Sequence, residues 1–252
     1  MKKRKNRPLE VNDSTQQQPK EDRSPIIPQR SKLRNSLDVY ERELTPKQQS
    51  FLDLALDKQS KLIFISGPAG TAKTYLAVQA ALYMISSKRV SDLIYIRSVV
   101  ESADAKLGYL PGEVGDKMAP YLAPLMEKLE ELLPRNQIDL LKKEERISGF
   151  PVGHLRGRNW NAKVIIGDEC QNMTEKELVT LITRTGEFAK VFIIGDPEQS
   201  DINGKSGFIK MVSRFNDEEC RENGIHVFEF TDDDIVRSAL VRFISKRLKK
   251  VV

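Results

Sequence analysis

The sequence predicts an α/β fold in which a mostly parallel β-sheet carries helices on both faces. Three observations lead to this prediction. Short apolar runs alternate with longer helical stretches, a glycine-rich loop joins one such run to a helix, and another run ends in two acids. With 252 residues, the chain is long enough for one substantial domain but too short for a second core of similar size.

The first 43 residues are expected to form a disordered basic tail, and the ordered domain is expected to span residues 44–252. The tail is rich in Gln, Pro, Ser and charge, so it has too little apolar surface to offset the entropy lost on ordering. Residues 1–37 contain ten Lys or Arg and four Asp or Glu, so the excess positive charge lies there. Such an arm can contact nucleic-acid phosphates or serve as a solvated tail, and both alternatives stay open.

Local signals predict the elements in order. A first helix is expected after Thr45, a suitable N-cap that is followed by proline at the first helical position. Two capping boxes, at residues 174–177 and 231–234, predict two later helices. Five apolar runs predict the strands, namely residues 61–66, 92–97, 163–167, 190–195 and 225–231.

Residues 67–74 read Gly-Pro-Ala-Gly-Thr-Ala-Lys-Thr and have the strand-to-helix context of a Walker A loop. In such a loop, backbone N–H groups surround the β-phosphate and a helix N-terminus adds partial positive charge. Lys73 is expected to reach the β- and γ-phosphates, and the Thr74 hydroxyl is expected to bind Mg²⁺. The candidate nucleotide-binding residues of this loop are Gly67, Pro68, Ala69, Gly70, Thr71, Ala72, Lys73 and Thr74.

One residue departs from the pattern GxxxxGK[ST], because Ala72 stands where glycine is usual. Alanine is tolerated there if the backbone is near-helical, whereas a positive φ would cost about 1 kcal/mol or more. The segment could also be a plain turn before a buried helix, although a second motif argues against this alternative.

That second motif is an apolar run, Val164–Gly167, which ends in the acids Asp168 and Glu169 and resembles a Walker B strand. On a strand neighbouring the phosphate loop, Asp168 would hold Mg²⁺ through its water shell. Glu169 would polarise the attacking water as a general base. A pair of solvated carboxylates at a strand end is the alternative.

Two glutamines are further candidates. Gln199 follows another apolar run and could contact the γ-phosphate or orient the water, but the surrounding Asp-Pro-Glu-Gln sequence can also form a simple turn. Gln48 could bind the adenine edge, or it could complete a capping box with Thr45.

The chain resembles the PhoH-like family of P-loop ATPases, which are related to the core of superfamily 1 helicases. The resemblance covers about residues 44–241 and is carried by the glycine-rich loop, Leu107-Gly-Tyr-Leu-Pro-Gly112 and Asp168-Glu-Cys-Gln-Asn172. It implies a RecA-like P-loop NTPase fold, ATP hydrolysis with Mg²⁺, assembly into a ring, which we expect to be a hexamer, and a role in moving along or remodelling RNA.

Superfamily 1 helicases close the ATP site with an arginine from a second RecA-like half, which stabilises charge on the γ-phosphate. With a single half, this chain would need an arginine from another copy. Arg184 and Arg237 are the candidates, although either could be a surface or salt-bridging residue. Basic residues after strand ends are candidate nucleic-acid contacts, namely Arg97, Lys106, Arg156 and Arg158.

Two functions are therefore expected as alternatives. One is a Mg²⁺-dependent ATPase that translocates on or remodels RNA or single-stranded DNA, and the other is a nucleotide-switched assembly module that binds a protein partner without helicase activity. The chain has no apolar stretch of the ~20 residues that a membrane span requires and no secretory signal. Its two cysteines lack metal-ligand spacing. We expect a cytoplasmic protein with ATP and Mg²⁺ as cofactors.

Overall fold

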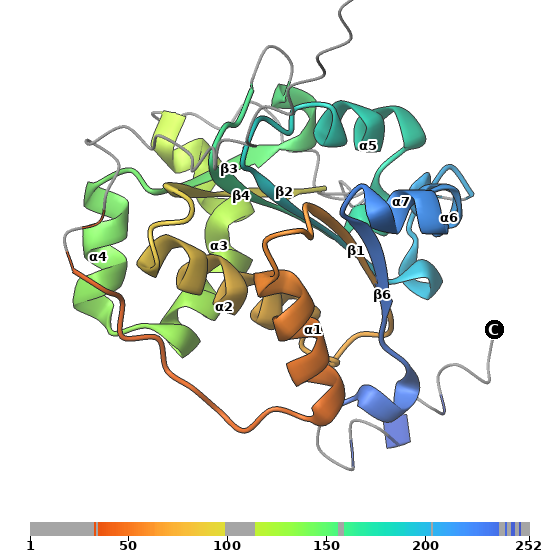
Figure 1. The fold of residues 1–252 in the computed structure, drawn as a ribbon, viewed down its shortest axis with the longest axis horizontal. Helices are drawn as coiled ribbons and strands as arrows, with labels where there is room; N and C mark the ends of the chain where they lie inside the picture. Colours follow the sequence, from red (N-terminus) through yellow and green to blue (C-terminus); the bar gives the residue numbers. More distant parts are fainter. Residues whose placement is uncertain are drawn as a thin grey trace, which may run out of the picture.

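The computed structural model shows an open six-stranded sheet with helices on both faces, as predicted (Figure 1). It describes residues 33, 35–98, 114–155, 159–202, 204–236, 240, 243, 244 and 247, with the backbone alone for 114–121 and 154. The strands are β1 (Leu62–Ser66), β2 (Asp92–Arg97), β3 (Ile147–Pro151), β4 (Lys163–Asp168), β5 (Lys190–Gly195) and β6 (Ile225–Glu229). The helices are α1 (Pro46–Leu56), α2 (Lys73–Ser86), α3 (Val114–Leu132), α4 (Arg135–Lys143), α5 (Glu175–Ile182), α6 (Phe208–Arg214) and α7 (Glu218–Glu222).

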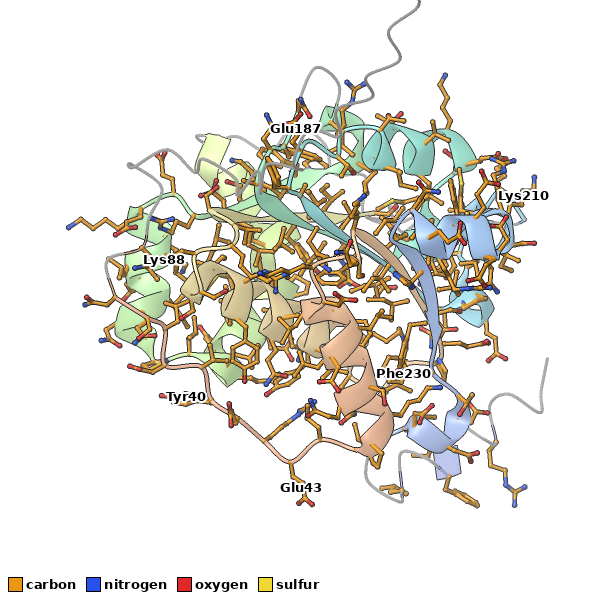
Figure 2. All side chains as sticks on the ribbon, viewed as in Figure 1. Tyr40, Glu43, Lys88, Glu187, Lys210 and Phe230 are labelled. Atoms are coloured by element: carbon orange, nitrogen blue, oxygen red, sulfur yellow. The ribbon has the colours of Figure 1, made fainter. Side chains whose placement is uncertain are left out.

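The sheet separates two hydrophobic cores. Successive side chains of a strand point to opposite faces, so in β1 Ile63 and Ile65 enter one core while Leu62 and Phe64 enter the other. Helices α1 to α4 cover the first core, and α5 and α6 cover the second (Figure 1). Side chains fill the space on both sides of the sheet (Figure 2). Among the helices of the described residues, none combines the length and apolar character needed to cross a bilayer.

The strand order is β3-β2-β4-β5-β1-β6, and every neighbouring pair is parallel. All carboxyl ends therefore meet at one edge, where an α/β sheet positions ligand groups. The expectation that Asp168 lies on a strand adjacent to the phosphate loop is wrong, because β5 lies between β1 and β4. The tip of β5 consequently lies between the loop and the acids.

Two elements differ from the prediction. Strand β3 was not expected, because Gly149 and Pro151 interrupt its apolar pattern, and such a strand is tolerated because it lies at the sheet edge. The capping box at Thr231 and Asp234 is formed, but it opens a 3₁₀ turn, Asp232–Asp234, and Ile235 is already extended. Beyond Val236, the described residues Leu240, Phe243, Ile244 and Arg247 have helical backbone.

The domain begins earlier than residue 44. Residues 35–45, here called the strap, form no helix or strand and contact α4, α3 and α2 before α1 begins. Leu37 is buried in the first core, its N–H donates to Ser86 Oγ at 2.9 Å, and the N–H of Tyr40 donates to Leu132 O at 2.8 Å. The Tyr40 and Glu43 side chains point outward from the strap (Figure 2). With so few apolar anchors and no periodicity, the strap has no recognisable sequence signal, and residues 1–32 and 34 lie outside the described part.

Candidate nucleotide-binding site

The phosphate loop joins the carboxyl end of β1 to the start of α2. Gly67 and Gly70 have φ of 145° and 90°, which glycine adopts without strain. A Cβ on Gly67 would also lie 2.5 Å from Phe230 O. Ala72 has φ 68° and ψ 22°, which lie in the left-handed region. The backbone there is not near-helical, so alanine at this position carries the conformational cost expected for a positive φ.

Lys73 lies across the phosphate loop. Its Nζ donates to Gly67 O and Pro68 O at 2.7 Å each, and the residue is only 9% exposed. These bonds hold the ammonium group above the loop, where the loop N–H groups would bind phosphate oxygens.

The two motifs meet at Thr74 and Asp168. Thr74 Oγ1 donates to Asp168 Oδ1 at 3.1 Å, and the buried Tyr95 hydroxyl donates to Asp168 Oδ2 at 2.5 Å. Burial, together with the nearby Asp168 carboxylate, strongly raises the pKa of Tyr95, so this hydroxyl remains a donor. A hydroxyl and a carboxylate held together form a hard oxygen donor set that fits Mg²⁺, whose remaining ligands are commonly water and phosphate.

Glu169 has an unusual backbone, with φ 53° and ψ 37°. A non-glycine residue in the left-handed region carries strain that is often found at functional sites. Its Oε2 accepts a bond from Gln171 Nε2 at 2.6 Å, and its Oε1 lies 3.8 Å from Arg97 Nη2. A hydrogen bond from Gln171 and an ion pair with Arg97, at the end of β2, therefore orient the carboxylate beside Asp168.

The tip of β5 connects the phosphate loop to these acids. Asp196 Oδ2 accepts from the N–H of Ala69 at 3.1 Å, and Asp196 N–H donates to Gln171 Oε1 at 3.1 Å. Gln171, only 1% exposed, also donates to Gln199 O at 3.4 Å. Asp196 caps the 3₁₀ turn Pro197–Gln199 as well, so the turn considered from sequence is present and positions Gln199 at the pocket.

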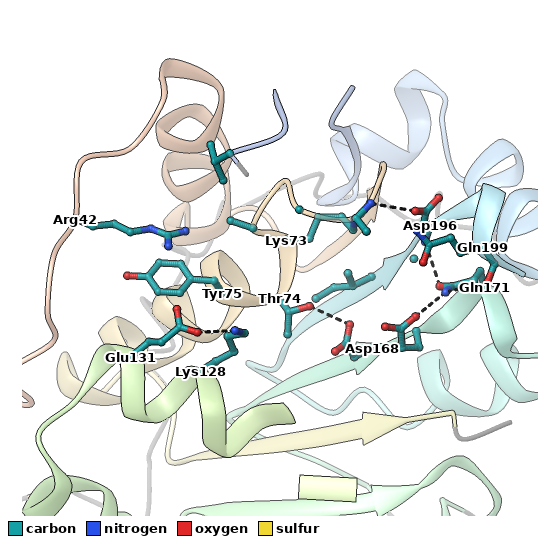
Figure 3. Close-up of a pocket in the computed structure, with 17 residues that line it drawn as sticks. Arg42, Lys73, Thr74, Tyr75, Lys128, Glu131, Asp168, Gln171, Asp196 and Gln199 are labelled. Carbon is teal, nitrogen blue, oxygen red and sulfur yellow. Dashed lines mark hydrogen bonds and ion pairs between the residues drawn. The ribbon is translucent and has the colours of Figure 1, made fainter. Parts of the chain in front are cut away.

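These groups line a cavity of about 350 Å³ (Figure 3). Lys73 and Thr74 lie between its two ends. The acids, Gln171, Asp196 and Gln199 line one end. The other end is formed by four side chains that were not among the predicted site residues, namely Arg42, Tyr75, Lys128 and Glu131.

Comparison with known proteins identifies the family. Residues 42–249 match the family described as PhoH-like protein. The PhoH-like protein of Mycobacterium tuberculosis strain H37Rv is 36% identical over 214 residues, which cover 82% of this chain and 59% of that protein. The PhoH-like protein of Bacillus subtilis is 34% identical over 199 residues, covering 78% and 61%.

The chain belongs to the PhoH-like family. It spans about three fifths of the length of these curated relatives. Among solved structures, the large terminase of a thermophilic bacteriophage is similar, with a TM-score of 0.50 and 13% identity, covering 82% of this chain and 50% of the terminase. At that identity the likeness concerns the fold, and it agrees with a P-loop NTPase fold for this PhoH-like chain.

The structure brings together most of the predicted site. The loop from Gly67 to Thr74, Asp168, Glu169 and Gln199 surround or line one cavity. Gln171 belongs to the Asp-Glu-Cys-Gln-Asn motif, and its bonds to Glu169 and Asp196 give it an orienting position that the motif alone does not predict.

Three other predictions have different outcomes. Gln48 forms the capping box with Thr45 and donates to Thr71 O at 3.4 Å, and it is not among the pocket-lining residues, so it supports the loop from behind. Arg184 follows α5 near the amino ends of β4 and β5, at the sheet edge opposite the pocket. Arg97 ends β2 and pairs with Glu169. The candidates Lys106, Arg156, Arg158 and Arg237 lie outside the described residues.

Proposed function

We propose that this PhoH-like chain is a Mg²⁺-dependent ATPase that uses hydrolysis to move along or remodel RNA or single-stranded DNA as a ring-shaped oligomer. The observation that carries the ATPase proposal is the 3.1 Å hydrogen bond between Thr74 and Asp168. It joins the phosphate loop to the Walker B acid across an intervening strand, which is the arrangement that a bound metal and triphosphate require.

The residues of the pocket have distinct roles in this proposal. Loop N–H groups and Lys73 would bind the phosphates, and Thr74 and Asp168 would hold Mg²⁺, which would supply positive charge against the phosphate oxygens. Glu169 would take a proton from the attacking water as its oxygen bonds to the terminal phosphorus, while the bond from that phosphorus to the bridging oxygen breaks and ADP leaves. Gln171 orients Glu169, and Gln199 orients the water.

Two observations support an oligomer. Among the described residues that line the cavity, the one arginine is Arg42, which lies at the end away from the acids. Arg97 lies near the acids but is paired with Glu169, so a second cation at the terminal phosphate would come from another copy. Arg184, away from its own pocket, and Arg237 remain the candidates. Exposed apolar side chains near the C-terminus offer an interface, namely Val236, Leu240, Phe243 and Ile244.

The ATPase proposal is tested with the full chain and its Glu169→Gln variant. The variant keeps the shape of the side chain but loses the base, so we expect unchanged ATP affinity and turnover lower by about 10²-fold or more. Calorimetry with Mg²⁺ and ATP measures affinity, and phosphate release measures turnover. Normal turnover in the variant would refute the role of Glu169, and absence of Mg²⁺-dependent ATP binding by the unaltered chain would refute the ATPase itself.

The nucleic-acid proposal has a separate test. Single-stranded RNA or DNA should raise ATP turnover, and the stimulation should weaken as salt increases because phosphate contacts release counterions. Native mass with and without ATP reports the oligomer. Unchanged turnover with every nucleic acid, together with ATP-dependent assembly, would favour the nucleotide-switched module that binds a protein partner.

A further inference from the structure

The second end of the pocket is lined by Arg42, Tyr75, Lys128 and Glu131, to which the proposed ATPase assigns no step. We propose that it is a nucleoside-binding subsite, in which the base stacks on the Arg42 guanidinium and Glu131 accepts hydrogen bonds from the sugar or base. The inference depends on the proposed ATPase function and assigns the base and sugar of its nucleotide to particular side chains.

The direction of the triphosphate follows from the geometry of the cavity. Asp168 and Glu169 mark the end where the terminal phosphate must lie, because metal and water are needed there. Lys73 and Thr74 occupy the middle, and Tyr75 is the next residue of α2. A chain of phosphates that runs from the acids across Lys73 and Thr74 therefore leads the nucleoside toward Tyr75, which lies beneath Arg42 (Figure 3).

Arg42 is a suitable stacking platform. Its guanidinium carbon lies 3.5 Å from the centre of the Tyr75 ring, and that ring is buried, at 5% exposure. The tyrosine covers one face of the planar group. Arg42 itself is exposed and lines the cavity, so the other face can receive a flat aromatic ligand. Arginine planes and bases stack well, and a guanidinium held by a ring has already lost much of its rotamer freedom.

The strap explains why Arg42 is held there. Asp38 and Gln137 exchange two hydrogen bonds, of 2.9 and 2.7 Å, between the strap and α4. Glu41 Oε1 accepts a bond from the Tyr83 hydroxyl of α2 at 3.1 Å. These contacts hold the strap on the approach to Arg42 and so place this residue beside the cavity, where its side chain stacks on Tyr75.

Glu131 and Lys128 give this end its polar groups. Lys128 Nζ donates to Glu131 Oε1 at 2.5 Å and to Glu127 Oε1 at 2.9 Å. A carboxylate held in this way is an acceptor suited to ribose hydroxyls or to an amino group on the base. Inorganic phosphate chains have neither group, and they also lack a ring to stack.

A ligand with phosphates but no nucleoside therefore tests the proposed subsite. Calorimetry on the full chain compares Mg²⁺ with ATP and Mg²⁺ with inorganic tripolyphosphate, which has the phosphates but no nucleoside. For Arg42→Ala we expect a Kd for ATP that is about tenfold higher, equivalent to about 1.4 kcal/mol, and an unchanged Kd for tripolyphosphate. Glu131→Gln should also raise the Kd for ATP, by a smaller factor, and should leave the Kd for tripolyphosphate unchanged. Arg135→Ala, an exposed arginine on α4 outside the pocket, is the matched control and should change neither constant.

The outcomes separate this inference from the ATPase proposal. If Arg42→Ala weakens both ligands equally, Arg42 acts on phosphate and the nucleoside subsite is refuted. Unchanged ATP affinity in Arg42→Ala, or a native chain that binds tripolyphosphate as tightly as ATP, also refutes it. A native chain that binds neither ligand would overturn the ATPase proposal first, and this inference would fall with it.

Discussion

Replacing Ala72 by glycine is expected to stabilise the domain even though it removes a side-chain methyl. Ala72 has φ 68° and ψ 22°, and a residue with a Cβ in this region costs about 1–2 kcal/mol. Glycine removes that cost, but its greater conformational freedom in the unfolded chain lowers the free energy of unfolding by about 0.4–1 kcal/mol. The methyl is only partly buried, so little packing is lost. The free energy of unfolding should rise by about 0.5–1 kcal/mol.

Urea unfolding without nucleotide, followed by circular dichroism, measures this change. At equal m value, Ala72→Gly should move the midpoint to higher urea. The matched control is Ala80→Gly, in the interior of α2, where the backbone is helical and the methyl is fully buried. That variant should lose about 1 kcal/mol or more. If both variants lose similar stability, residue 72 is helical in solution and the left-handed conformation is refuted.

Two further predictions concern buried polar groups. Gln171→Leu removes the donor to Glu169 and the acceptor for Asp196 N–H, so turnover should fall about 10- to 100-fold while the Kd for ATP changes little. Phosphate-release assays and calorimetry measure the two quantities, and unchanged turnover would contradict the orienting role. Burial, followed by the nearby Arg89 charge, lowers the pKa of Lys190 from 10.5 to about 7. The folded state then loses this proton at lower pH than the unfolded chain, so the free energy of unfolding should rise with pH between about 7 and 10.5. Lys190→Met should flatten that rise in urea unfolding series, and an identical slope in both proteins would show that another group causes it.

The parts of the site that could be predicted from the sequence are those whose residues lie next to one another in the chain. The phosphate loop and the Asp168-Glu169 pair each lie in one short segment whose strand context is also local, so spacing alone identifies them. The parallel sheet followed from alternating apolar runs for the same reason. Sequence could not decide between two roles of Gln48, because one spacing suits both an adenine contact and a capping box. The observed bonds to Thr45 and Thr71 show the capping role.

The nucleoside end could not be predicted because its residues come from three separate elements. Arg42 belongs to the strap, Tyr75 to α2 and Glu131 to α3, and only packing of α2 against α3 brings them to one cavity. The strap itself is held by backbone and polar side-chain bonds spread over three helices, which leave no periodic pattern in the sequence. Signals of this kind become visible only when the tertiary contacts are known.

The position of β5 between β1 and β4 has a consequence for how the site works. Asp196, at its tip, accepts from the N–H of Ala69 in the phosphate loop and donates to Gln171, which in turn holds Glu169. The loop that would bind phosphate and the carboxylate that would activate water are thus joined by consecutive hydrogen bonds across one strand end. Were β1 and β4 adjacent, as first expected, no third strand tip would lie between them. A change in the loop on nucleotide binding would therefore reach Glu169 through Asp196 and Gln171, which is why Gln171→Leu should affect turnover more than affinity.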